Sequence, residues 1–129
     1  MMSKPGVRQD AREQAHRAAE AIRQLNHHTL PHEDWPGLDS VQDLSDVVTE
    51  LTYMVGRLPQ ACEQQSLWLD RHAEAIGDDR GDPSTVEELQ ESLLLIGEEA
   101  RKLHELMSPS AATASHLHHP GDDRDPEMT

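Results

Sequence analysis

Four regularly spaced carboxylates are the clearest candidate for chemistry in this sequence. Their spacing of 4, 3 and 4 residues places them on one face of a helix, as an acidic stripe opposite its apolar face. Such a stripe can be a solvated helix face, a docking ridge for a basic protein, or a DNA mimic whose carboxylates replace phosphates. We expect partner binding here and leave the alternatives open. The four residues are Asp39, Asp43, Asp46 and Glu50.

Two groups of histidines are candidates for a metal site, because imidazole and carboxylate ligands suit zinc and nickel. Both groups lie in loop or terminal sequence with no rigid scaffold, and Pro31 keeps His28 and His32 off a common helical face. We therefore expect ordinary surface histidines. The first group is His116, His118 and His119 with Asp122 and Asp123, and the second is His27, His28 and His32 with Glu33 and Asp34.

Catalytic motifs are missing from the sequence. It contains no GxSxG, HExxH, P-loop or GxGxxG pattern. The single cysteine, Cys62, lies on an apolar helical stripe with Leu58 and Leu69, which predicts a buried side chain and no nucleophile. We expect no enzymatic activity and no cofactor.

Hydrophobic periodicity predicts an all-α fold, a small bundle of three main amphipathic helices. The first covers residues 9–28, with a stripe formed mostly by alanine. The second begins near Val41 and continues towards Ile76, with a kink or break expected at Gly56 to Pro59, because proline removes a backbone hydrogen bond. Its first half carries Val41, Leu44, Val48, Leu51, Val55 and Leu58.

The third helix has the strongest pattern, three heptads between residues 86 and 107. We expect this seam to be buried core or a contact with a second copy, and the sequence does not separate the two. The seam consists of Val86, Leu89, Leu93, Ile96, Ala100, Leu103 and Met107. The expected domain organisation is therefore a flexible N-terminus (1–8), a helical bundle domain (9–107) and a mobile His/Asp-rich tail (108–129).

Composition bears on assembly and partners. Leu, Ile and Val make up 24 of the 129 residues and phenylalanine is absent, so the core is thin and self-association is expected. The formal net charge of -14 repels nucleic acid and anionic membranes, which favours a basic protein partner over direct nucleic-acid binding. No apolar run approaches the roughly 20 residues of a membrane span, and residues 1–10 lack the apolar segment of a secretory signal. With a lone cysteine, this predicts a cytoplasmic protein.

Two resemblances accompany these patterns. The stretch LTYMVGRLPQACEQQSLWLDR (51–71), with the Gly/Asp turn and heptad helix after it, resembles small helical proteins of unknown function from high-GC actinobacteria, in a mobile-element context. Trp35-Pro36-Gly37 is similar to the turn of secreted WXG helical-hairpin proteins. We do not assign the chain to that family. The export signal of the family is YxxxD/E, and here the position four residues after Tyr53 holds Arg57 in place of an acidic residue. The combined prediction is a non-enzymatic cytosolic interaction module, with a DNA-mimic inhibitor and weak histidine-based metal binding as alternatives.

Overall fold

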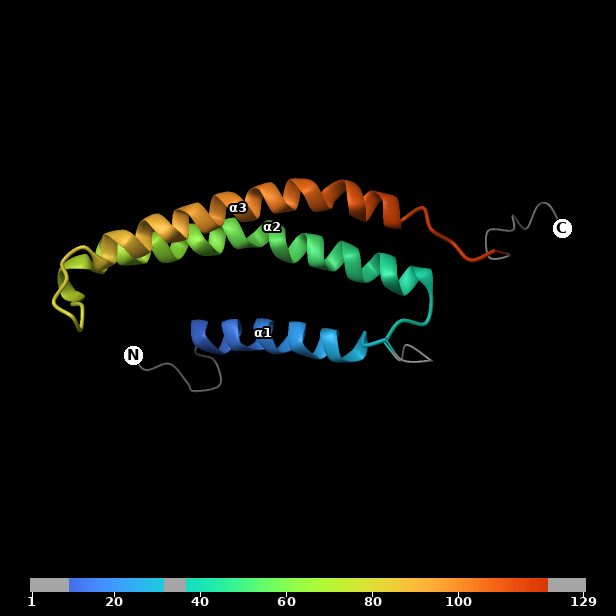
Figure 1. Cartoon of the computed structure of the whole chain (residues 1–129), viewed down its shortest axis with the longest axis horizontal. Coiled ribbons are helices and arrows are strands. Elements are labelled where there is room, and N and C mark those ends of the chain that lie inside the picture. Colours follow the sequence, from blue (N-terminus) through green and yellow to red (C-terminus); the bar gives the residue numbers. More distant parts are fainter. Residues whose placement is uncertain (1–9, 32–36, 121–129) are drawn as a thin grey trace, which may run out of the picture. The chain divides into compact units, whose positions relative to one another are not determined.

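The computed structural model describes residues 10–31 and 37–120. These residues form three α-helices, α1 (Ala11–His28), α2 (Val41–His72) and α3 (Thr85–Ala114), with a short 3-10 helix, η1 (Ala73–Ala75), after α2 (Figure 1). No β-strand occurs within these two ranges, so the predicted all-α class is confirmed. The chain divides into two compact units, one ending at Ser40 and the other beginning at Val41, and each is described by itself.

Several predicted features lie outside the described residues. They are the flexible N-terminus (1–8), the loop around Trp35, and the part of the predicted tail beyond residue 120. Among the residues that the structure does describe, no helix is both long enough and apolar enough to cross a membrane.

Helix α1 begins and ends with local hydrogen bonds. The Asp10 carboxylate accepts a hydrogen bond from the Arg12 backbone N–H at 3.0 Å, which satisfies one of the open donors at the helix start. Two ion pairs follow the helix surface, Arg17 with Glu13 at 3.2 Å and Arg23 with Glu20 at 2.7 Å. The alanine-rich stripe ends in two half-buried side chains, Ile22 and Leu25.

Helix α2 is continuous from Val41 to His72 with Pro59 inside it, so of the predicted kink or break at Gly56 to Pro59 the break does not occur. Pro59 is buried against α3, where Gly97 offers no side chain; a Cβ atom at Gly97 would lie 3.6 Å from the Pro59 Cα. The absence of a side chain at Gly97 therefore lets the α2 backbone at Pro59 lie close to α3. Figure 1 shows that α2 and α3 follow the same gentle curve.

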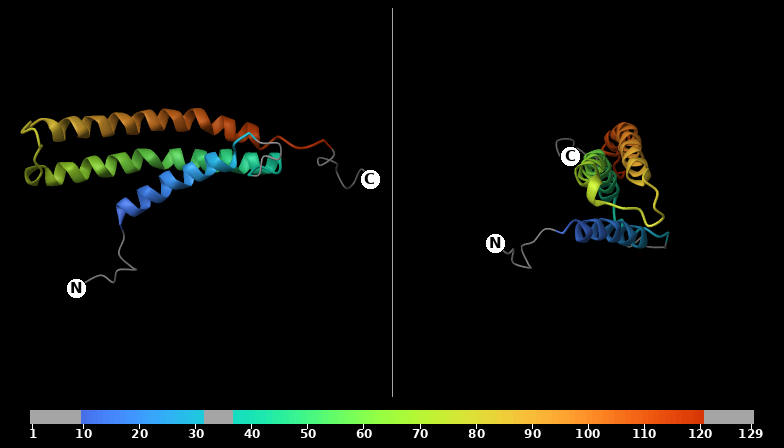
Figure 2. Two further views of the ribbon diagram at one scale, coloured as in Figure 1. Left: turned by 60° about the horizontal axis from the view of Figure 1, so that its bottom comes forward. Right: turned by 90° about the vertical axis from the view of Figure 1, so that its left-hand side faces the viewer.

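Helices α2 and α3 form an antiparallel pair that packs along most of its length (Figures 1 and 2). The buried residues of α2 follow the 3,4 spacing of a coiled-coil seam. Most of them are small or polar, so the pair has a narrow core. On α2 they are Ser45, Thr52, Val55, Pro59, Cys62, Ser66 and Leu69, and on α3 they are Gly97, Ala100 and Ala114.

Helix α3 continues past the predicted domain boundary at residue 107. It passes through Pro109 and ends at Ala114, which is buried. The prediction treated residues 108–114 as tail because they contain no large apolar side chain. Alanine is nevertheless sufficient in this seam, since the buried residues opposite are also small. Residues 108–114 therefore belong to the helical pair.

Candidate functional site

The seam between α2 and α3 uses a different register from the predicted one. Nine residues of α3, spaced alternately by 4 and 3, are buried or half-buried along α2: Val86, Gln90, Leu93, Gly97, Ala100, His104, Met107, Ala111 and Ala114. Cross-helix contacts fix this register. The Gln90 amide donates to the Ser66 carbonyl oxygen at 3.2 Å, Gly97 lies against Cys62, and His104 lies against Gly56.

Three predicted seam residues are therefore not core in this chain. Leu89, Ile96 and Leu103 are 47%, 54% and 45% exposed. The predicted placement of Val86, Leu93 and Met107 along the seam agrees with their half-buried state. The close approach of the two backbones explains why Leu89, Ile96 and Leu103 lie outside the seam. There is room between the helices for small residues such as glycine and alanine, which lie one position after some of the large side chains.

The displaced large side chains share one angular position on both helices. Each directly precedes a seam residue: Leu44, Leu51 and Leu58 precede Ser45, Thr52 and Pro59, and Leu89, Ile96 and Leu103 precede Gln90, Gly97 and His104. On each helix these side chains are rotated by one residue, in the same direction, from the seam. In an antiparallel pair, equal rotations on the two helices place both rows on the same side of the seam. We call this surface the lateral flank, formed by Leu44, Leu51, Leu58, Leu89, Ile96 and Leu103.

Contacts on both sides of the seam agree with this assignment. On the opposite side, Arg101 forms an ion pair with Glu63 at 3.0 Å, and this contact raises the pKa of the guanidinium. On the flank side, a groove of about 260 Å³ is lined by residues from both helices, namely Gln65, Trp68, Leu69, Leu89 and Leu93. The Arg101–Glu63 side therefore carries an ion pair beside the exposed Leu94, and the other side carries a groove with mostly apolar lining.

The two rows of the lateral flank overlap only near the middle of the helical pair. Gly56 lies against His104 and Gly97 against Cys62, so Leu58 lies at a level between Ile96 and Leu103. Towards the loop, Leu89 reaches the groove beside Trp68. The lateral flank therefore has apolar side chains from one helix at each end and from both helices only near Leu58 and Leu103, and contiguous apolar surfaces mark interaction sites.

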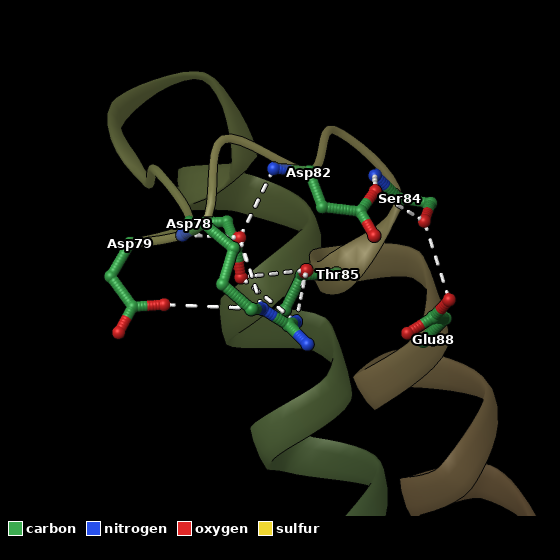
Figure 3. Close-up of polar contacts among 7 residues, drawn as sticks. Asp78, Asp79, Asp82, Ser84, Thr85 and Glu88 are labelled. Atoms are coloured by element: carbon green, nitrogen blue, oxygen red, sulfur yellow. Dashed lines mark hydrogen bonds and ion pairs between the residues drawn. The ribbon is translucent and has the colours of Figure 1, made fainter.

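The loop between α2 and α3 is organised by Asp78 (Figure 3). The Asp78 carboxylate, whose side chain is 6% exposed, accepts hydrogen bonds from the Arg80 backbone and guanidinium, the Asp82 backbone N–H and the Thr85 hydroxyl. These donors, with the Arg80 side chain first, lower the pKa of Asp78 to about 2. Gly81 has φ +75°, a conformation that favours glycine.

Loop geometry also sets where α3 begins. The Asp82 carboxylate accepts from the Ser84 N–H at 2.9 Å and from its hydroxyl at 2.7 Å, which lowers the pKa of Asp82. An open pocket of about 530 Å³ under the loop shares Leu69 and Leu89 with the groove of the lateral flank. The sequence marked this segment only as a polar turn, and no spacing rule pointed to Asp78.

Only part of the predicted acidic stripe is placed as one surface. Asp46 and Glu50 are exposed and Asp43 is partly exposed, all on α2 away from its buried row. The Asp46 carboxylate accepts a hydrogen bond from the Gln42 amide at 3.0 Å. Asp39 precedes the helix and belongs to the other compact unit. The stripe in the described structure is therefore Asp43, Asp46 and Glu50.

The tail histidines follow α3 and are exposed. His119 has a specific role, because its Nε2 atom accepts a hydrogen bond from the Val41 backbone N–H at 3.0 Å, at the start of α2. This contact was not predicted. Within residues 10–31 and 37–120, no group of three His, Cys, Asp or Glu side chains could hold a metal ion. Asp122, Asp123, His32, Glu33 and Asp34 lie outside these ranges, and metal binding by His116, His118 and His119 stays a prediction.

Cys62 is a free thiol buried in the seam, as predicted. Comparison with known proteins adds no further constraint: the sequence matches no protein-family model, no curated protein and no solved structure. The resemblance of residues 51–71 to small actinobacterial proteins stays a prediction. Functional inference therefore depends on the surfaces of the α2–α3 pair.

Proposed function

We propose that this chain is a non-enzymatic protein-interaction module whose binding surface is the lateral flank. One observation carries the proposal: six large apolar side chains of α2 and α3 lie beside the seam, while many of the residues buried in the seam are small. The lone cysteine is buried, which fits a reducing compartment such as the cytoplasm.

The pattern of apolar positions supports this interpretation. Helices that pair only with each other need one narrow seam, whereas helices in a larger bundle carry a third apolar row beside it. Both α2 and α3 carry that third row, in Leu44, Leu51 and Leu58 and in Leu89, Ile96 and Leu103. Each helix therefore has the surface of a bundle helix with one side uncovered in the pair.

The energy available is appreciable. Full burial of a leucine or isoleucine contributes about 1.5–3 kcal/mol, so covering six partly exposed side chains contributes several kcal/mol before the cost of association. The seam itself buries little apolar area, since its buried apolar residues in the described structure are few and mostly small: Val55, Pro59, Cys62, Leu69, Ala100 and Ala114. Partner binding on the lateral flank would thus add substantially to the core.

Site-specific photo-cross-linking tests the proposal. A photo-reactive phenylalanine analogue replaces either Ile96 or Leu95 in cells that produce this chain. Both side chains are more than half exposed and are adjacent in sequence, but only Ile96 belongs to the lateral flank. We expect discrete protein adducts from position 96 and few from position 95. Equal labelling at both positions, or none at 96, would contradict a binding surface at the flank.

A second candidate function is binding of a basic partner through the acidic stripe of α2, with DNA mimicry as a special case. The exposure of Asp46 and Glu50 on the outer face of the helix supports it. Exposed carboxylates attract arginine and lysine mainly through long-range field effects, which salt screens. This candidate uses a different surface from the lateral flank, so the two are tested separately.

A further inference from the structure

We propose that the cavity at the loop end of the α2–α3 pair binds a small organic cation, an ammonium group carried on an apolar body. The cavity has a volume of about 530 Å³ and lies between the end of α2, the loop after η1 and the first two turns of α3. Pockets for small molecules in proteins usually measure about 300–1,000 Å³. The cavity shares only Leu89 with the lateral flank, so this inference goes beyond the proposed function and does not depend on it.

The floor of the cavity is apolar. Leu69 is buried in the seam, Ile76 and Val86 are half-buried, and Leu89 adds an exposed side chain from α3. Leu69 and Leu89 also line the groove of about 260 Å³ beside Trp68, so the two hollows adjoin. An aliphatic or aromatic ligand body would therefore contact apolar surface, which forms most of the lining in small-molecule sites.

The lining also carries three hydrogen-bond acceptors that have no donor among the described residues. Both hydrogen bonds from Ser84 go to Oδ1 of Asp82, at 2.9 and 2.7 Å, and none goes to Oδ2. The Gln90 amide nitrogen donates to the Ser66 carbonyl oxygen at 3.2 Å, which leaves the amide oxygen Oε1 open. Glu87 is exposed and forms neither a hydrogen bond nor an ion pair with any described residue. A ligand that complements this cavity must therefore supply donors.

The formal charge of the lining is negative. Among the residues that the structure describes there, none is lysine, arginine or histidine, and three are acidic: Asp78, Asp82 and Glu87. The Arg80 guanidinium neutralises Asp78 at 3.1 Å, so two carboxylates remain. The N–H and hydroxyl groups of Ser84 lower the pKa of Asp82, which keeps that carboxylate ionised at neutral pH. The first turn of α3 also lines the cavity, but a helix N-terminus carries only about half a positive charge, so the balance favours a cation over an anion.

An alkylammonium group fits this lining. It has three N–H donors and accepts no hydrogen bond, which complements the open oxygen atoms of Asp82, Glu87 and Gln90. The wall that carries Asp82 is already ordered, because the Asp78 carboxylate accepts from the Asp82 backbone N–H at 3.0 Å and from the Thr85 hydroxyl at 2.8 Å (Figure 3). Binding to an ordered wall costs less conformational entropy than binding that must first close a flexible loop.

Fluorescence titration of the full chain with dansylcadaverine at pH 7 and 0.15 M salt tests this inference. The probe joins a primary ammonium group to an apolar dansyl ring, and dansyl-aminohexanoic acid is its control, with a carboxylate in place of the ammonium group. We expect saturable binding of the ammonium probe and roughly tenfold weaker binding of the carboxylate probe, because like charges repel. The formal net charge of -14 also disfavours the carboxylate probe, so substitutions must locate the binding of the ammonium probe.

Two matched pairs of substitutions locate this binding. Glu87→Gln should raise the Kd of the ammonium probe severalfold, whereas Glu91→Gln removes the same charge one turn further along α3, outside the cavity, and should change the Kd little. Leu89→Gln should likewise weaken binding, and Leu95→Gln is its control outside the cavity. All four residues are exposed, so circular dichroism should show unchanged helicity in each variant.

Three outcomes would overturn the inference. They are no saturable binding of dansylcadaverine at millimolar concentration, equal affinity of the wild type for both probes, or equal effects of the two members of either pair of substitutions. None of these outcomes bears on cross-linking at position 96, because Ile96 does not line the cavity.

Discussion

Gly97 of α3 lies directly against Cys62 of α2. A Cβ atom added at Gly97 would lie 3.4 Å from the Cys62 Cβ and 3.6 Å from the Pro59 carbonyl oxygen. An alanine at this position would make ordinary van der Waals contacts, and a larger side chain would have no room between the helices. The small residues of the seam therefore determine how near the two helices approach, and that approach places the larger neighbours on the lateral flank.

The first prediction concerns this contact. Gly97→Leu should push α3 away from α2 and lower the free energy of unfolding by roughly 1–3 kcal/mol, as overpacking does in cores. Gly97→Ala is the control and should change stability by less than about 1 kcal/mol, since alanine's better helix propensity offsets the tight contact. Urea denaturation followed by circular dichroism measures both. Equal stability of the leucine variant and the wild type would show that the helices are not closely packed here.

The second prediction concerns the loop. Asp78→Asn keeps the shape of the side chain but removes the charge that accepts five hydrogen bonds, so the variant should be less stable at neutral pH. Its neighbour Asp79, which is 96% exposed, provides the control Asp79→Asn, with little effect expected. Thermal melts of the three proteins at pH 7 compare them. An equal loss in both variants would mean that Asp78 has no special role.

The pH dependence of this difference has a definite sign. The pKa of Asp78 is about 2 in the folded chain, below its ordinary value of 3.8. The carboxylate therefore stabilises the fold fully above about pH 4, and the contribution is lost as the pH falls towards 2. The difference in melting temperature between wild type and Asp78→Asn should narrow over that interval. A constant difference from pH 6 to pH 2 would contradict the lowered pKa.

The third prediction tests the extended end of α3. Truncation after Met107 removes Ala111 and Ala114 from the seam and should cost about 1–2 kcal/mol, because buried apolar area is lost. Truncation after Ser115 keeps the whole helix and removes the contacts of the following residues, including that of His119 with Val41, so its melting temperature should fall less. If both truncations melt alike, residues 108–114 do not contribute to the packed pair.

Much of the fold follows from local sequence rules. Apolar periodicity located all three helices, and the turn that contains Gly81 separates α2 from α3 as its Gly/Asp composition predicts. The register did not follow, for a physical reason. The observed seam and the predicted one both fit a 3,4 alternation, because they differ by one residue at every second position. A prediction that favours large apolar side chains therefore chooses Leu89 and Ile96 over Gln90 and Gly97. Backbone proximity, which decides between them, is a tertiary property.

The candidate site was accordingly predicted in part. The residues Leu89, Ile96 and Leu103 were singled out, but as a seam in which core and self-association were not separated. The structure removes them from the core and unites them with Leu44 and Leu58 of α2. Asp78 could not be found from spacing, because its donors come from backbone and side-chain groups that meet only when the loop closes.

The fourth prediction concerns the acidic stripe. Asp46→Lys with Glu50→Lys should leave the melting temperature nearly unchanged, since both residues are exposed, and should abolish binding of a synthetic arginine-rich helical peptide. Glu87→Lys with Glu91→Lys changes the net charge equally on α3 and serves as the control. Binding measured by fluorescence anisotropy should persist in the control. Equal weakening in both double variants would show that net charge, not the stripe, attracts the peptide.

The final prediction uses ionic strength to test the acidic stripe. At 0.15 M ionic strength the screening length is about 8 Å, so exposed opposite charges attract less than at low salt. Binding of the arginine-rich peptide to Asp46 and Glu50 should therefore weaken severalfold between 0.02 M and 0.15 M salt. Fluorescence anisotropy at both salt concentrations measures this shift. An affinity that does not change with salt would contradict binding through charge attraction.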